Sequence, residues 1–176
     1  MNVHSFKLID SRPQQFGAGF DMDRGLQQTP SLPSFPSVQK EFTMHPQFSK
    51  ADALSREAIG AAIEVHRILG PGLLESIYEK CLLRELEIRE IAAITQDQVE
   101  IEYKGITFTE KLKFDLLVDG CLLIEVKAVQ TVHPVHKAQL LSYMKLLDVP
   151  LGLLLNFHEM KLIDGLSRMI LPGANK

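Results

Sequence analysis

The apolar residues of this chain predict two consecutive helices in its middle third. From Ala53 to Leu69 they recur at the three- and four-residue spacing of an amphipathic helix, and a second helical segment runs from Leu73 to Arg89. Between the two segments, Gly70-Pro71-Gly72 interrupts the helical pattern. We therefore expect two helices joined by a short turn.

Strand-like segments and one more helix fill the rest of the chain. Pro134 is a start signal for a helix over Val135 to Leu147, and Lys104-Gly105 predicts the tight turn of a hairpin. The strand-like segments, all rich in apolar residues, are 99–103, 106–108, 114–118, 121–128, 151–157 and 168–171. This order predicts an α/β domain with a mixed central sheet flanked by helices.

Three charged residues interrupt the most apolar of the predicted hairpins. Asp115 lies in its first strand, and Glu125 and Lys127 lie one residue apart in its second strand. Asp119-Gly120 between the strands is a strong signal for a hairpin turn. Because a buried charge is costly unless it is paired or binds a metal, these residues mark a candidate site.

The length of the turn decides whether the two carboxylates meet. A two-residue loop would pair Asp115 with Ile124 and place Asp115 and Glu125 on opposite faces of the sheet. A three-residue loop of Val118-Asp119-Gly120, with Gly120 in the left-handed conformation, makes Asp115 face Leu123 and lie diagonal to Glu125. Lys127 then shares their face, so we expect a loop with an odd number of residues or a bulge. The other face would be apolar, with Phe114, Leu116, Leu122, Ile124 and Val126.

Two carboxylates at one point suit a hard cation such as Mg²⁺ or Mn²⁺. Lys127 beside them supplies a positive charge that can orient a water or stabilise a pentavalent phosphate. The alternative is a structural ion pair at the margin of the sheet.

Polar residues at helical spacing favour a site over an isolated ion pair. Gln139 and Tyr143 lie four residues apart, on one face of the predicted helix over 135–147. Glu75 and Tyr78 lie one turn apart in the second predicted helix. Helices on both sides of the hairpin thus carry polar groups that could face it.

Six motifs occur in a characteristic order along residues 51 to 172: GPGLLESIYEK, YKG, FDLLVDG, IEVKA, HKAQLLSY and LLLNF. Together they resemble the GxxExxY family, a compact branch of the PD-(D/E)XK nuclease superfamily. The spacing of Gln139 and Tyr143 after Glu125 and Lys127 is similar to the RecB-type exonuclease arrangement. The resemblance implies a restriction-endonuclease-like fold over the whole predicted domain.

The resemblance also implies a metal site. Asp115 and Glu125 correspond to the metal ligands, together with the Val126 carbonyl oxygen. Glu75 corresponds to the acid on the helix, which completes the site or holds a second ion. The implied cofactor is Mg²⁺ or Mn²⁺.

The remaining motif residues correspond to groups that act on water and substrate. Lys127 corresponds to the catalytic lysine that positions the attacking water, and Gln139 and Tyr143 to helix residues that fix the substrate strand or the lysine. One position departs from the superfamily pattern, because Phe114 stands where a proline precedes the first aspartate. That proline is often replaced in the superfamily.

These motifs favour a Mg²⁺-dependent nuclease that acts on DNA, with RNA as the less favoured substrate. The first alternative is a catalytically inactive nuclease-fold module that binds nucleic acid or a protein partner, and the second is a small-molecule phosphoesterase. The intact set of Asp115, Glu125 and Lys127 favours an enzyme, because a binding module does not need buried metal ligands.

Composition separates a tail, residues 1–50, from a domain, residues 51–176. The tail holds five of the nine prolines and six of the nine phenylalanines without helical or strand periodicity, which predicts a flexible extension. No secretory or transmembrane segment is evident. Cys81 and Cys121 lie in apolar segments and are expected to be buried thiols in a reducing compartment, the cytoplasm.

The net charge of the predicted domain limits how it can bind nucleic acid. Residues 51–176 carry fourteen basic and eighteen acidic side chains. Because affinity for duplex DNA comes mostly from neutralised phosphates, such a domain should not coat DNA nonspecifically. We expect a local basic patch near the site, with Lys104, Lys111, Lys113, Lys137 and Lys145 as candidates.

Overall fold

The computed structural model describes residues 44–95 and 97–176. The predicted flexible tail therefore lies, except for residues 44–50, outside the described residues. Among the described residues, no helix is both long and apolar enough to cross a membrane.

Two helices begin the described part of the chain. Helix α1 spans Phe48–Leu69 and starts five residues before the predicted position, and α2 spans Glu75–Ile88. Gly70 follows α1 with a φ of 68°, a conformation that glycine adopts without strain, and its N–H donates to the His66 carbonyl oxygen at 2.8 Å. The predicted pair of helices with a glycine-containing turn is confirmed.

A mixed five-stranded sheet lies at the centre of the fold. Its strands, in spatial order, are β1 (Ala93–Ile94), β4 (Leu116–Val118), β5 (Leu122–Lys127), β6 (Leu151–Asn156) and β7 (Leu166–Ile170). Strands β5 and β6 are parallel, and every other neighbouring pair is antiparallel. The predicted α/β class with a mixed sheet is confirmed. The short β1 and the 3₁₀ helix Leu162–Gly165 were not predicted.

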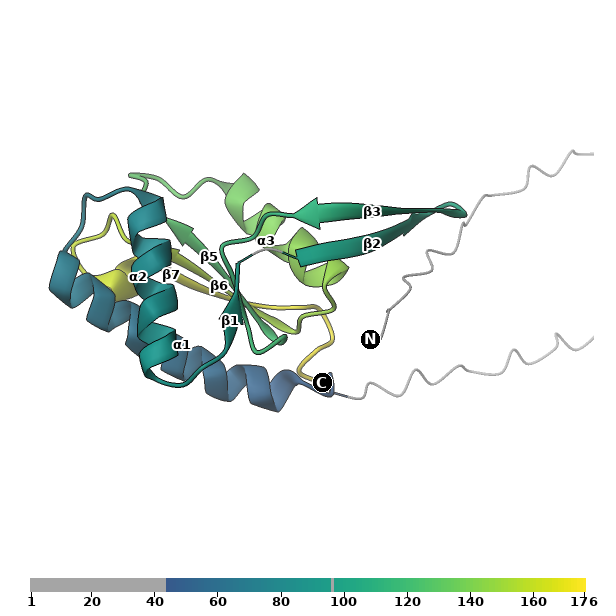
Figure 1. The fold of residues 1–176 in the computed structure, drawn as a ribbon, viewed down its shortest axis with the longest axis horizontal. Helices are drawn as coiled ribbons and strands as arrows, with labels where there is room; N and C mark the ends of the chain where they lie inside the picture. Colours follow the sequence, from purple (N-terminus) through teal and green to yellow (C-terminus); the bar gives the residue numbers. More distant parts are fainter. Residues whose placement is uncertain (1–43, 96) are drawn as a thin grey trace, which may run out of the picture.

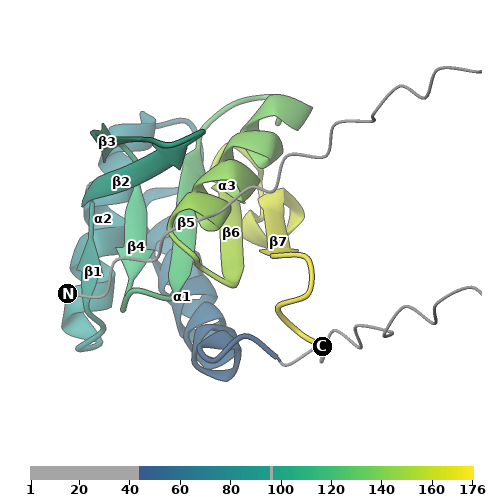
Figure 2. The same ribbon diagram turned by 90° about the vertical axis from the view of Figure 1, so that its right-hand side faces the viewer.

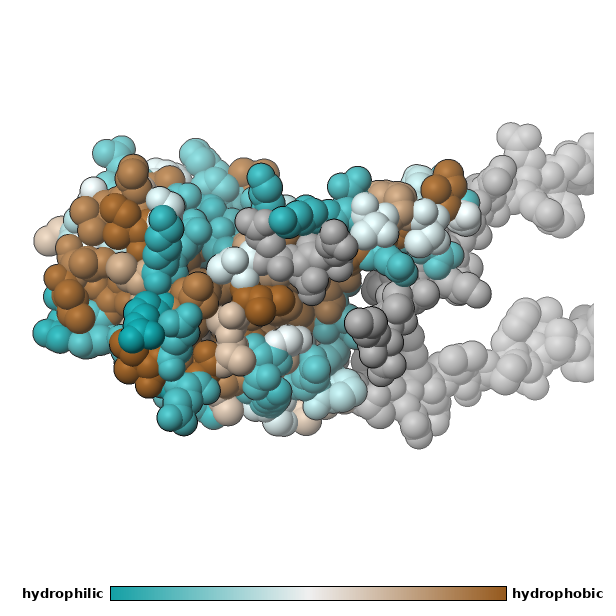
Figure 3. All heavy atoms as spheres, in the orientation of Figure 1, coloured by the Kyte–Doolittle hydropathy of each residue, from teal (hydrophilic) through white to brown (hydrophobic). Residues whose placement is uncertain are grey.

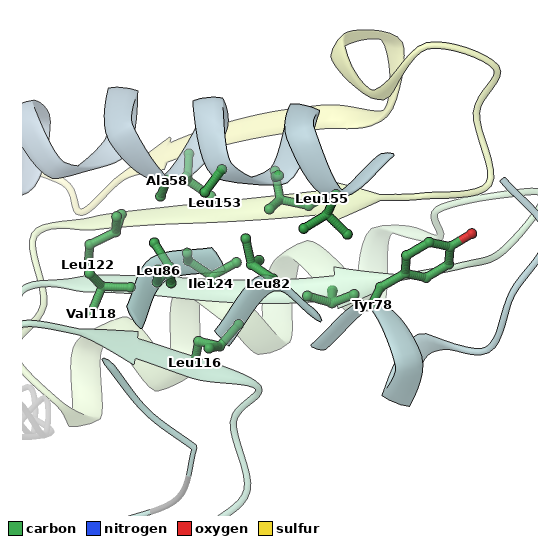
Figure 4. Packing of buried hydrophobic residues seen from close by; sticks show 14 of the residues in the cluster. Ala58, Tyr78, Leu82, Leu86, Leu116, Val118, Leu122, Ile124, Leu153 and Leu155 are labelled. Carbon is green, nitrogen blue, oxygen red and sulfur yellow. The ribbon is translucent and has the colours of Figure 1, made fainter. Parts of the chain in front are cut away.

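Helices cover both faces of this sheet (Figures 1 and 2). Helices α1 and α2 pack on one face, where Leu82 and Leu86 of α2 meet Leu116, Ile124 and other buried side chains of the sheet (Figure 4). Helix α3, Pro134–Leu146, covers the opposite face through Leu140 and Met144. Strand β6 is buried along its whole length and β5 is buried up to Val126, as expected for central strands covered on both sides.

Strands β2 (Asp97–Tyr103) and β3 (Ile106–Leu112) form a separate two-stranded sheet, which extends from the body of the molecule as an arm (Figure 1). The predicted hairpin around Lys104-Gly105 is confirmed, with a longer second strand. Tyr103, Ile106 and Phe108 are exposed on the arm, and apolar side chains appear there on the surface (Figure 3).

The turn between β4 and β5 sets the register of the candidate site. Val118 pairs with Leu122, so three residues, Asp119, Gly120 and Cys121, form the loop. The prediction of a three-residue loop is confirmed, but its residues were placed one position too early, and Leu123 faces Leu117 instead of Asp115.

The predicted face of the sheet was also wrong for one residue. Phe114 packs in the α3-side cluster with Leu117 and Leu123, and not with Leu116 and Ile124. Strand β4 begins only at Leu116. Because the chain before it is not in strand conformation, the alternation of side chains does not extend back to Phe114.

Candidate active site

Strand β5 ends with the Glu125 and Lys127 side chains on the α3 side of the sheet, the side to which Leu123 also points. Glu125 is only 4% exposed. The Lys127 ammonium donates to Glu125 Oε1 at 2.5 Å and to the Val126 carbonyl oxygen at 3.1 Å. Two opposite charges thus meet at the carboxyl end of a buried strand.

Asp115 joins this pair from the neighbouring strand. The pairing of Leu116 with Ile124 places Asp115, the residue directly before β4, opposite Glu125. Asp115 Oδ2 accepts a hydrogen bond of 2.6 Å from the Val126 N–H. Both predicted strand acids and the predicted lysine are therefore brought together at one end of the sheet.

The surroundings of Asp115 make this carboxylate harder to ionise. Burial raises the pKa of Asp115 to about 6, and the charge of Glu125 adds to this, while the Val126 N–H and Lys127 act in the opposite direction. Burial alone would lower the pKa of Lys127, but its hydrogen bond to Glu125 and the charges of Glu125, Asp115 and Glu75 raise it overall. The site thus favours a cationic lysine and would be stabilised by further positive charge.

Glu75 reaches the same place from the other face of the sheet. It is the first residue of α2, and its Oε1 accepts a hydrogen bond of 3.0 Å from the Ala128 N–H, directly after β5. Its charge also contributes to the raised pKa of Asp115. The prediction that Glu75 projects from the second helix toward Asp115 agrees with this arrangement.

Tyr78 holds the turn that positions Glu75. Its side chain is fully buried, its ring stacks on Phe157 with centroids 4.3 Å apart, and its hydroxyl donates to the Gly70 carbonyl oxygen at 2.6 Å. The same hydroxyl accepts from the Leu73 N–H at 3.1 Å. The tyrosine of this motif thus fixes the turn through Gly70 and Leu73, and the glutamate faces the site.

Asn156 fixes the chain beyond Lys127, and no role for it was predicted from the sequence. Its side chain, 1% exposed at the end of β6, accepts from the Val129 N–H at 3.0 Å and donates to the Val129 carbonyl oxygen at 2.8 Å. Next to it, the Phe157 N–H donates to the Lys127 carbonyl oxygen at 2.7 Å. A single polar residue within the apolar run 151–157 was the signal that could have identified it.

Glu79 is a second acidic residue of α2 near the site, and it was not predicted from the sequence. It is half-buried, and its pKa is raised by burial first and then by the charges of Asp115 and Glu75, while Lys127 and Lys80 lower it. Its position four residues after Glu75, on the same helical face, was the signal that could have revealed it.

Gln139 and Tyr143 lie on α3 as predicted, but neither makes a hydrogen bond or ion pair with a site residue among the described residues. Gln139 is exposed, and Tyr143 is partly buried against the α3-side cluster. His136 of the same helix is half-buried, and its Nδ1 is buried without a hydrogen-bond partner. The predicted roles of Gln139 and Tyr143 stay predictions.

The donor atoms of the site suit a hard cation. Asp115, Glu125 and the Val126 carbonyl oxygen offer only oxygen atoms, and Mg²⁺ in proteins is commonly bound by one or two carboxylates while it keeps several waters. No group of three or more His, Cys, Asp or Glu side chains in residues 44–95 and 97–176 is arranged to hold a metal ion. The oxygen donors of Asp115, Glu125 and the Val126 carbonyl therefore fit a hard cation that keeps part of its water shell.

Comparison with known proteins gives one match. The family model described as the PD-(D/E)XK nuclease superfamily matches residues 52–169, which include every site residue described above. Searches of curated proteins and of solved structures gave no match.

Proposed function

The chain belongs to the PD-(D/E)XK nuclease superfamily, and we propose that it is a divalent-cation-dependent nuclease that hydrolyses phosphodiester bonds in DNA. The observation that carries this proposal is the convergence of Asp115, Glu125 and Lys127 at the end of β5. Their motifs also support a place in the GxxExxY branch. Nucleases of this superfamily generally use divalent metals.

The proposed cation site consists of Asp115, Glu125 and the Val126 carbonyl oxygen. Glu75 would complete it from its place at the Ala128 N–H, although the described residues hold no ready-made group of three such side chains. A bound Mg²⁺ or Mn²⁺ would supply Lewis-acid charge for the phosphate and lower the pKa of a bound water. Asp115 is held by the Val126 N–H and Glu75 by the Ala128 N–H, so both carboxylates are positioned before any ligand arrives. Such preorganisation reduces the free-energy cost of ordering the site.

Lys127 is proposed to orient the attacking water and to stabilise charge that develops on the phosphate. Its ammonium is nearly buried and carries a raised pKa, so it remains positively charged at neutral pH. Gln139 and Tyr143, on the helix that covers this face of β5, are proposed to contact the substrate strand. A fixed charge in a site of low water content stabilises a developing charge more strongly than one in bulk water.

The proposed cellular location is a reducing compartment such as the cytoplasm. Cys81 and Cys121 are both free thiols, and Cys121 is buried. Free thiols of this kind are typical of proteins in reducing compartments.

The test combines cleavage assays with calorimetry. Wild-type protein is expected to cut single-stranded, duplex or flap DNA only with Mg²⁺ or Mn²⁺. Lys127→Ala should lose turnover by about 10²-fold or more while it keeps most of its Mg²⁺ affinity, because the lysine acts on water or phosphate. Glu125→Gln should lose both turnover and Mg²⁺ affinity, because it removes a ligand charge.

Two exposed residues provide matched controls. Lys161→Ala and Glu57→Gln alter the same residue types at exposed positions outside β5, and both should behave like wild type. If wild type stays inert on every DNA substrate but binds one of them as well as Lys127→Ala does, the protein is a nucleic-acid-binding module instead. If RNA is cut and DNA is not, the substrate class is wrong.

A further inference from the structure

Lys127 and the proposed cation compete for the same oxygen atoms. The ammonium donates to Glu125 Oε1 and to the Val126 carbonyl oxygen, which are both proposed cation ligands. A cation at these oxygens would displace the ammonium from at least one of them. A lysine confined to a nearly buried site then needs another negatively charged acceptor, because an unpaired buried charge is costly.

Three of the four carboxylates around Lys127 already have hydrogen-bond donors. Asp115 accepts from the Val126 N–H, Glu75 accepts from the Ala128 N–H, and Glu125 accepts from Lys127 itself. Glu79 makes no hydrogen bond or ion pair with any of the described residues, although it is half-buried. Because the other three carboxylates are proposed cation ligands, Glu79 is the carboxylate of this cluster that would remain for the ammonium.

The position of Glu79 suits this role. It follows Glu75 by one turn of α2, on the helical face that also carries the buried Tyr78 and Leu82. One turn before it, the Glu75 side chain accepts from the Ala128 N–H, which directly follows Lys127, so this face of α2 lies beside the end of β5. The charges that act on the pKa of Glu79 agree with this position, because they come from Asp115 and Lys127 of the sheet and from Glu75 and Lys80 of its own helix. Of the two lysines, Lys80 is exposed, so Lys127 is the one inside the site.

We propose that Glu79 is a positioning residue that accepts the Lys127 ammonium when a divalent cation engages Glu125. The lysine has a flexible four-carbon stem and three donors, so it can exchange one carboxylate for another while its charge stays in the site. Glu79 would thereby keep the ammonium beside the phosphate without competing for the cation. This inference rests on the proposed function of the same site.

A double-mutant cycle read by Mg²⁺ calorimetry tests the proposal without needing catalysis. Glu79→Gln should weaken Mg²⁺ binding about three- to tenfold, because the displaced ammonium loses its acceptor. In the Lys127→Met background the same substitution should have little effect, because no ammonium has to move. Glu79→Asp should restore part of the affinity, and the exposed Glu90→Gln is the matched control.

Turnover gives the second measurement. Glu79→Gln should lower kcat on DNA about tenfold or more at saturating Mg²⁺, with little change in KM, and should add nothing to the loss caused by Lys127→Met. If Glu79→Gln weakens Mg²⁺ binding equally in both backgrounds, Glu79 acts on the cation directly and the proposal is overturned. If the binding cycle behaves as expected but the wild type cuts no nucleic acid, the nuclease proposal fails while the role of Glu79 stands.

Discussion

Asp115 is the residue at which stability and proposed function are most clearly opposed. Burial and the nearby Glu125 raise its pKa to about 6, so the fold disfavours the ionised form that a cation would require. Such an arrangement is common where a site is built to receive an opposite charge, and it lowers the stability of the free protein. The free-energy cost of burying the ionised Asp115 carboxylate exists in the ligand-free protein, and it falls when a cation binds.

We expect Asp115→Asn to raise the melting temperature by a few degrees at pH 7.5 in a buffer with chelator. Asparagine can still accept from the Val126 N–H, but it carries no charge to bury. Because the pKa is about 6 in the folded protein against an ordinary 3.8, the folded state binds the proton more tightly between these values. The free energy of unfolding of the wild type therefore falls as pH rises from about 4 to 6.

The pH dependence separates this cause from a general packing effect. Thermal melts of both proteins at about pH 4 should nearly coincide, and the advantage of the variant should grow up to about pH 6 and then stay constant. An equal difference at pH 4 and pH 7.5 would show that the charge of Asp115 is not the cause. Asp115→Asn should also lose Mg²⁺ affinity, whatever its stability.

At the scale of elements, the turn between β4 and β5 and the turn before α2 determine the site. Asp119 and Gly120 both have positive φ, 47° and 68°, which aspartate and glycine tolerate better than most residues. The three-residue loop then keeps Asp115 on the side of Glu125. In the second turn, the Tyr78 hydroxyl fixes Gly70 and Leu73, so that α2 starts with Glu75.

The sequence was sufficient to predict these elements, because hydrophobic periodicity and turn residues are local signals. It predicted that the loop was odd in length, but it could not fix the register to one residue, since that depends on where β4 begins. The roles of Glu79 and Asn156 depend on contacts between α2, β5 and β6. Such contacts join segments that are distant in the sequence, so no local pattern predicts them. The only signals were the four-residue spacing of Glu79 from Glu75 and the isolated polar Asn156 in an apolar strand.

Asn156 provides the test at this scale. We expect Asn156→Ala to lower the free energy of unfolding by about 2 kcal/mol or more, because it leaves the partly buried N–H and carbonyl of Val129 without their partners. Turnover should fall as well, because the end of β5 carries Lys127 and the next residue supplies the Ala128 N–H that holds Glu75. Urea denaturation and a cleavage assay measure the two effects.

Asn175→Ala is the matched control, because Asn175 is exposed near the C-terminus. It should leave both stability and turnover close to the wild type. Equal behaviour of the two variants would show that the Asn156 hydrogen bonds do not hold the end of β5 in place.

At the scale of the whole molecule, the described residues form both layers around the sheet. Helices α1 and α2 cover one face and α3 covers the other, so the central strands are buried by elements within residues 44–176 (Figure 2). A hydrogen bond joins the two ends of the described part of the chain: the His45 N–H donates to the Ala174 carbonyl oxygen at 2.9 Å.

We accordingly expect removal of residues 1–43 to change the melting temperature by no more than about 2 °C, which corresponds to less than about 1 kcal/mol for a domain of this size. The composition of this segment offers no periodic apolar face to bury. Removal of residues 1–50 is the informative comparison, because it also removes His45, the first turn of α1 and the ion pair of Lys50 with Asp119. Scanning calorimetry should show a clear loss of stability only for the longer deletion. A large loss for the shorter deletion would show that the phenylalanines of the N-terminal segment dock on the domain.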